Sequence, residues 1–213
     1  MKIRSFIVAY ALVLAILLFA DRRTGSTPDN RYSHIVDLTQ PQASDAGLKA
    51  PSGTRIISPA ALIPGTWSAG QIPAERLIAP LVVVDLKTAD QAGQVTLDDI
   101  AVWESRNGVV PQGAVVAIRR PGKASGAASL PITAEAAQFL MDARYVLGFA
   151  VENTANLKSD RTLARQLALH GNYVVDGATR LASLPETGSL VIVAPAKTKD
   201  SAEAPVRVMA MVK

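Results

Sequence analysis

The run Leu81–Leu86 (LVVVDL) is the feature that most constrains the fold of this chain. Its residues are apolar apart from one Asp, and three adjacent valines stand at its centre. A strand with one solvated face would alternate apolar and polar residues, so a continuous apolar run indicates a strand buried on both faces. Val115–Ile118 and Tyr145–Val151 have the same character. The sequence therefore predicts at least three strands in the interior of a domain.

Helix signals separate these runs. Thr96 and Asp99 form a capping-box pattern that opens a helix, and Asn107–Gly108 is a stop signal for it. Thr133 is expected to cap a second helix, Ala134–Ala143, and Arg161–Leu169 reads as a third. The remaining predicted strands are Tyr32–Thr39, Gly171–Val175 with Asp176 at its end, Leu190–Ala194 and Val206–Val212.

Composition narrows the class of protein. The 213 residues suit one globular domain, and 49% hydrophobic with 19% charged residues is too apolar for a disordered chain. The net charge of +4 is spread along the sequence, with no basic cluster longer than a pair. Nucleic-acid binding needs a concentrated basic face, so we do not expect it. The absence of Cys excludes disulfides, thiolate nucleophiles and thiolate metal sites.

The N-terminus reads as an export segment. Lys2 and Arg4 precede an uninterrupted apolar run over residues 6–20, which Asp21 and two arginines close. We interpret residues 1–23 as a signal peptide or membrane anchor. Leu18 makes cleavage after Ala20 unfavourable, so an uncleaved anchor remains open beside a removed signal peptide. A buried helix of the domain is the weaker alternative, since the segment has no polar face.

This interpretation divides the chain into three parts. Residues 24–31 are expected to be a polar linker and residues 32–213 a single domain. The domain is then exported, periplasmic or otherwise extracytoplasmic, with possible membrane attachment through residues 6–20.

The segment from Gly53 to the run at 81–86 carries a family resemblance. Gly53-Thr54 and Pro59 keep the spacing of a motif, and Gln71–Leu77 (QIPAERL) follows before the buried strand. This pattern resembles the cyclase family of metal-dependent hydrolases, which includes bacterial kynurenine formamidase and isatin hydrolase. In that family a His-x-Gly-Thr-His-x-Asp-x-Pro-x-His motif binds the metal. The resemblance extends over residues 32–213.

The resemblance implies a fold, an activity and an assembly. The expected fold is α/β, a single cyclase-like domain with a central mixed β-sheet packed by helices, preceded by an N-terminal apolar helix. The implied activity is metal-dependent amide hydrolysis of the arylformamidase type, with zinc or manganese as the metal. The implied assembly is a homodimer or a higher oligomer.

The metal ligands of the family are largely replaced in this chain. By the register of the motif, the four ligand-bearing positions carry Pro51, Arg55, Ile57 and Ala61. A further His of the family falls on Ala164, and its Glu falls on Asp176, the one ligand-type residue retained. Catalytic zinc needs about three protein ligands. We therefore expect no metal cofactor, and assign no catalytic residue.

Arg55 places a cation where the resemblance puts the metal charge. We predict that it pairs with Asp176 or with Glu152, which ends the strand at 145–151. A surface arginine on an altered loop is the alternative. The candidate pocket residues are Gly53, Thr54, Arg55, Ser58, Glu152 and Asp176.

The chain has two histidines. His34 is expected to be an ordinary strand residue near the surface. His170 with Asp176 could in principle activate Ser52, Thr54 or Ser58 as a nucleophile. Nothing in the sequence fixes the geometry of such a group, so this idea has little weight.

Three functions remain open. The preferred hypothesis is an exported or membrane-tethered cyclase-family protein, a pseudoenzyme that binds a ligand or supports a partner protein. The alternative is an active hydrolase of formamide or cyclic amide bonds with an altered site, and it would need zinc or manganese or a metal-free mechanism. A third hypothesis, a purely structural envelope domain, differs from the first in having no ligand.

Overall fold

Four parallel strands form the centre of the domain, and helices connect them. The computed structural model describes residues 32–41, 53–86, 93–120, 130–153 and 157–213, and Tyr32–Lys213 forms one compact unit. The strands are β1 (His34–Asp37), β2 (Arg55–Ile57), β3 (Ile78–Asp85), β4 (Val115–Arg119), β5 (Gly148–Val151), β6 (Tyr173–Asp176), β7 (Ser189–Pro195) and β8 (Glu203–Val212). The α-helices are α2 (Pro59–Leu62), α3 (Leu97–Asn107), α4 (Ala134–Ala143) and α5 (Arg161–Leu169). Short 3₁₀ turns are η2 (Ala69–Gln71), η3 (Ala74–Arg76), η4 (Leu157–Ser159) and η5 (Leu181–Ser183).

The sheet closes on itself. Its strand order is β1-β8-β2-β6-β5-β4-β3-β7, and β7 also pairs with β8. Strands β3 to β6 are parallel, whereas β2, β7 and β8 join them by antiparallel pairing. A seven-strand barrel results, with β1 added at β8. The sequence-based prediction of a mixed sheet with helices is confirmed, but that prediction did not include closure.

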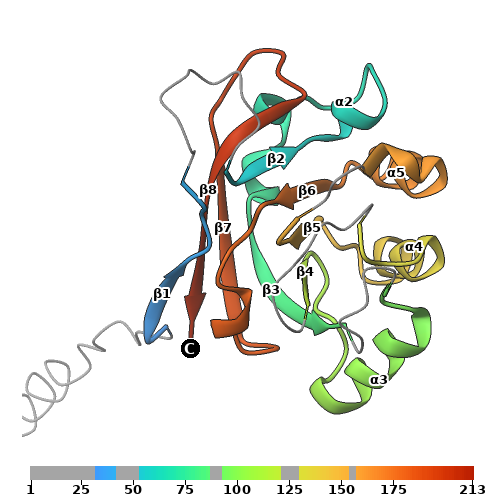
Figure 1. The fold of residues 1–213 in the computed structure, drawn as a ribbon, viewed down its shortest axis with the longest axis vertical. Coiled ribbons are helices and arrows are strands. Elements are labelled where there is room, and N and C mark those ends of the chain that lie inside the picture. Colours follow the sequence, from blue (N-terminus) through green and yellow to red (C-terminus); the bar gives the residue numbers. More distant parts are fainter. Residues whose placement is uncertain (1–31, 42–52, 87–92, 121–129, 154–156) are drawn as a thin grey trace, which may run out of the picture. The chain divides into compact units, whose positions relative to one another are not determined.

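Two hydrophobic cores lie on opposite faces of the strands. Val82 and Val84 of β3 contact the core under the helices, whereas Leu81 and Val83 face the core inside the barrel. Successive strand residues point to opposite faces, so an uninterrupted apolar run fills both cores at once. Figure 1 shows α3, α4 and α5 on one side of the sheet and β7 and β8 on the other. Burial of the 81–86 strand on both faces is thus confirmed.

The helix boundaries follow the predicted local signals. Thr96 accepts a hydrogen bond from the Asp99 backbone N–H, and Asp99 accepts one from Thr96 N–H, so the capping box opens α3. At its other end Gly108 has φ +85° and caps the helix. Thr133 caps α4 through the Ala136 N–H. Each start is fixed by residues within three positions, which is why the sequence predicts it.

Two expectations need correction or fall outside the described residues. The strand predicted from Tyr145 begins at Gly148, because Tyr145 has φ +52°, which extended backbone does not allow. The predicted apolar helix and linker at residues 1–31 lie outside the described part of the chain. Within the described ranges no helix is long and apolar enough to cross a membrane.

Candidate functional site

The short strand β2 places Arg55 beside a carboxylate. Residues 55–57 pair with β6 on one side and with β8 on the other, and the register puts Arg55 directly opposite Asp176. Arg55 Nη2 lies 2.8 Å from Asp176 Oδ2, and Arg55 Nε lies 3.7 Å from Glu203 Oε2. The predicted ion pair between Arg55 and Asp176 is therefore present. It is formed with Asp176 and not with Glu152.

The side chain of Arg55 lies on the helix side of the sheet. Ile56 belongs to the core inside the barrel, while Ile57 belongs to the core under the helices. Because residues two apart on a strand share a face, Arg55 and Ile57 point the same way, and Asp176 follows as the cross-strand partner of Arg55. Three of the positions that the resemblance assigns to metal ligands, those of Arg55, Ile57 and Asp176, thus share one face of the sheet.

The other two described positions of that set are apolar. Ala61 on α2 packs against the core under the helices, and Ala164 on α5 is buried. Helices α2 and α5 contact each other. Ile57 is also almost fully buried, at 5% exposure. The sixth position, Pro51, lies outside the described residues.

Thr54 holds the start of β2 in place. Its hydroxyl donates to the Gly177 carbonyl at 2.7 Å and accepts from the Gln40 backbone N–H at 2.6 Å. Gly177 has φ +76°, and a Cβ there would lie 2.8 Å from the Gly53 carbonyl oxygen. The backbones therefore approach too closely for any other residue at 177. Gly53 and Thr54 fix the strand that carries Arg55, and the Thr54 hydroxyl is fully engaged in doing so.

Ser58 has a similar structural role. It is completely buried, and its hydroxyl donates to the Ala202 carbonyl at 2.6 Å. Its backbone N–H donates to the same carbonyl at 3.0 Å. Ser58 thereby connects the end of β2 to the segment that leads into β8.

Glu152 follows β5 at the same end of the sheet. Its neighbour Val151 pairs with Asp176 in the parallel ladder. Burial raises the pKa of the Glu152 carboxyl, and the positive charge of Arg120 partly opposes this effect. The end of the sheet at Asp176 therefore carries several charged groups, with Arg55 and Asp176 in direct contact.

The two histidines lie away from this cluster. His34 is exposed on β1, as predicted, and its Nδ1 contacts the Ser33 hydroxyl at 2.9 Å. His170 precedes β6, whereas Asp176 is the last residue of that strand. The His170 ring contacts the Gln166 carbonyl through Nδ1 and Asp142 through Nε2, both at 2.8 Å. The hypothesis that His170 and Asp176 form a catalytic base pair is wrong.

The side chains present do not fit a divalent metal. Arg55, Ile57, Ala61 and Ala164 offer no lone pair that an ion could use. The Asp176 carboxylate binds the Arg55 guanidinium, and that cation would repel another one. Across the described ranges, no three His, Cys, Asp or Glu side chains come together in a way that could hold an ion. The donor set is therefore unsuited to zinc or manganese.

Sequence reasoning missed Glu203. This residue starts β8, and it approaches Arg55 because β8 pairs with β2 when the barrel closes. The two residues are far apart in the chain, and no motif surrounds Glu203. A prediction of the β2–β8 pairing would have been needed to find it.

Comparisons with known proteins agree on one family. A family model described as "Putative cyclase" matches residues 28–156. The fold is similar to isatin hydrolase A from Labrenzia aggregata bound to benzyl benzoate, with a TM-score of 0.72, 26% identity, and coverage of 91% of this chain and 98% of that one. Isatin hydrolase A from Ralstonia solanacearum matches with a TM-score of 0.70, 24% identity, and coverage of 84% and 92%. A search of curated proteins found no match.

Proposed function

The chain belongs to the cyclase family, and from this premise we propose that it is a pseudoenzyme that has kept the fold and lost metal-dependent hydrolysis. Its role is then to bind a ligand or to support a partner protein. The observation that carries the proposal is the 2.8 Å contact between Arg55 and Asp176 at paired positions of adjacent strands. A guanidinium there takes up the carboxylate that a metal would need.

The chemistry of hydrolysis supports this proposal. A bound metal ion generates a nucleophile at neutral pH by lowering the pKa of water. Arg55 cannot do so, because its guanidinium stays protonated in proteins and has no acceptor site. Thr54 and Ser58 are the hydroxyls nearest to Arg55 in the sequence among the described residues, and both already donate to backbone carbonyls. Within the described residues the site therefore has a cation that can bind and orient, but no nucleophile that is set up to react.

The proposal is tested by measuring metal and turnover together. The full-length protein is purified, its zinc and manganese content is determined by elemental analysis, and hydrolysis of N-formylkynurenine and of isatin is assayed with each metal added. The isatin hydrolase A from Labrenzia aggregata, treated in the same way, serves as the positive control. We expect less than stoichiometric metal and no turnover. Stoichiometric metal together with turnover would establish the alternative, an active hydrolase.

A variant with five substitutions tests whether the motif of the family has been aligned correctly with this sequence. It combines Arg55→His, Ile57→Asp and Ala61→His with Pro51→His and Ala164→His. We expect this variant to bind zinc or manganese more tightly than the wild type, because imidazole and carboxylate ligands are restored. Equal metal affinity of both proteins would show that these positions do not form one site.

Location and assembly are part of the same proposal. We propose that the apolar residues 6–20 export the protein or tether it to the membrane, and that the domain forms a homodimer or higher oligomer. Cell fractionation with and without residues 1–23 tests the first point. Light scattering of the purified protein tests the second. A cytosolic full-length protein, or a monomer at all concentrations, would contradict the respective part.

A further inference from the structure

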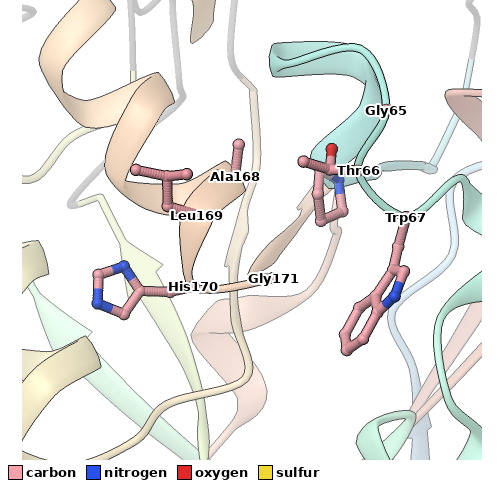
Figure 2. Close-up of a pocket in the computed structure, with 8 residues that line it drawn as sticks. Gly65, Thr66, Trp67, Ala168, Leu169, His170 and Gly171 are labelled. Carbon is pink, nitrogen blue, oxygen red and sulfur yellow. The ribbon is translucent and has the colours of Figure 1, made fainter.

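A pocket lies between α2 and the C-terminal end of α5. It is an open pocket of about 270 Å³, and the residues that line it include Pro59, Thr66, Trp67, Leu169, His170 and Gly171. Figure 2 shows Gly65 to Trp67 on one side and Ala168 to Gly171 on the other, with the His170 ring turned away from Trp67. Trp67 and Leu169 are 40% and 63% exposed, so the pocket presents large apolar side chains to solvent.

The Trp67 ring is held in a defined position. The Arg76 guanidinium stacks over the ring at 5.5 Å from its centroid, and Arg76 Nη2 donates to the Gly171 carbonyl at 3.2 Å. Gly171 has φ +67°, and a Cβ there would lie 3.0 Å from the Trp67 ring. The ring is therefore packed closely against backbone at one edge and against a cation on one face. Such pre-positioned aromatic rings bind with little loss of conformational freedom.

This pocket is separate from the Arg55–Asp176 pair. Gly171 precedes the first residue of β6, and Asp176 is the last residue of that strand. Arg55 stands at the start of β2 and Pro59 begins the helix after its end. Because β2 and β6 are antiparallel neighbours, both elements place the pocket at the opposite end of the strands from the ion pair.

The lining determines which ligands are suitable. It contains no carboxylate, no lysine and no arginine, and both nitrogens of His170 already have partners. A cationic ligand would lose hydration there without gaining a counter-charge, and the Arg76 guanidinium on the Trp67 ring would repel it. A ring without positive charge, by contrast, could bury apolar area against Trp67 and Leu169. The volume of about 270 Å³ is slightly below the usual range of roughly 300–1,000 Å³ for ligand sites, which restricts the ligand to one or two rings.

From these observations we infer that the pocket beside Trp67 is a binding site for a small aromatic molecule that carries no positive charge. This inference does not depend on whether the Arg55–Asp176 end of the barrel is catalytic. A ligand of this size binds weakly, with a dissociation constant on the order of 1 mM for a single ring.

A charge series of single-ring probes tests the inference. Benzyl alcohol, benzylamine and benzoate share one ring and differ in charge at neutral pH. Each is titrated into the ¹⁵N-labelled full-length protein while the NMR signals of Trp67 Nε1–H and Gly171 N–H are followed. We expect saturable shifts of both signals with benzyl alcohol, and at least fivefold weaker binding of benzylamine than of benzyl alcohol or benzoate. Unchanged pocket signals, or binding of benzylamine as tight as that of the other two probes, would overturn the inference.

Matched variants distinguish the pocket from nonspecific binding. Trp67→Ala is expected to weaken benzyl alcohol binding at least fivefold. Leu169→Ala changes an exposed position, so we expect the variant to fold, and it should weaken the binding at least twofold. Tyr145→Asn removes an exposed aromatic ring elsewhere and should leave the affinity unchanged. Loss of binding in Tyr145→Asn, or full affinity in Leu169→Ala, would contradict the assignment. Shifts of the Trp67 signal with protein concentration alone would indicate that a second copy covers the pocket, which would also overturn it.

Discussion

Replacing Arg55 with Met is the most direct test of what this side chain does. The substitution keeps a long, flexible side chain but removes the charge next to Asp176. The contact that is lost joins β2 to β6 at 2.8 Å, and a weaker one joins β2 to β8 at 3.7 Å. We therefore expect the variant to unfold more easily, without a change in the fold.

The size of the effect follows from how far the pair is buried. Breaking one side of a fully buried ion pair costs about 3–5 kcal/mol, and an exposed pair contributes about 0.2–1 kcal/mol. The Arg55 and Asp176 side chains are 24% and 10% exposed, which is between these limits. We expect Arg55→Met to lower the free energy of unfolding by about 2 kcal/mol, or the melting temperature by about 4–8 °C. Asp176→Asn should cost less, about 1 kcal/mol, because Arg55 keeps the Glu203 carboxylate nearby.

Urea denaturation followed by circular dichroism measures these differences, and the double variant completes a cycle. We expect a coupling energy of about 1 kcal/mol between residues 55 and 176. Arg207→Met is the matched control, because Arg207 pairs with Asp37 across two strands at 2.7 Å but both side chains are exposed, at 62% and 39%. If Arg55→Met and Arg207→Met lose the same small amount of stability, the pair at the end of β6 has no special role.

Three further predictions concern the surroundings of the site and the helices. Thr54→Val should cost about 1–3 kcal/mol in urea denaturation, because a buried hydroxyl with two hydrogen bonds is lost. Gly177→Ala should cost more than about 2 kcal/mol, whereas Gly65→Ala, also at positive φ but with open space around its Cβ, should cost about 1 kcal/mol; equal costs would refute the close approach. The hydrogen bond from Arg144 lowers the pKa of Glu104, so this pair stabilises the fold above the unfolded pKa of a glutamate, about 4.3, and the contribution disappears as pH falls through the lowered value. Glu104→Gln should therefore be less stable than wild type at pH 7 and closer to it at pH 3; a constant difference would contradict the pairing.

The sequence predicted the features that are determined by residues adjacent in the chain, namely helix ends and buried strands. The capping box at Thr96 and Asp99 and the glycine at 108 are read from a few adjacent positions, and they bound α3 as expected. The buried strand at 81–86 was equally clear, because both of its faces are apolar. Its burial on both faces could be predicted without knowing which strands pair with it.

Barrel closure could not be predicted in the same way. It depends on contacts such as the pairing of Ile56 with Ala204, which lie far apart in the chain. The sequences of β2 and β8 do not indicate which strands they pair with, and β2 has only three residues. The same reason explains the site: the pairing of Arg55 with Asp176 was predicted from a family register, whereas Glu203 was missed because only closure brings it near.

The position of Arg55 also gives its charge a structural role. Strand β2 connects β6 to β8, so it closes the barrel, and each of those strands brings a carboxylate to the side chain of residue 55. A neutral residue at 55 would remove the attraction of this side chain for both carboxylates, so the pairing of β2 with β6 and with β8 would each lose an ion pair. The charge of Arg55 therefore stabilises the closed barrel, whatever chemistry takes place beside it.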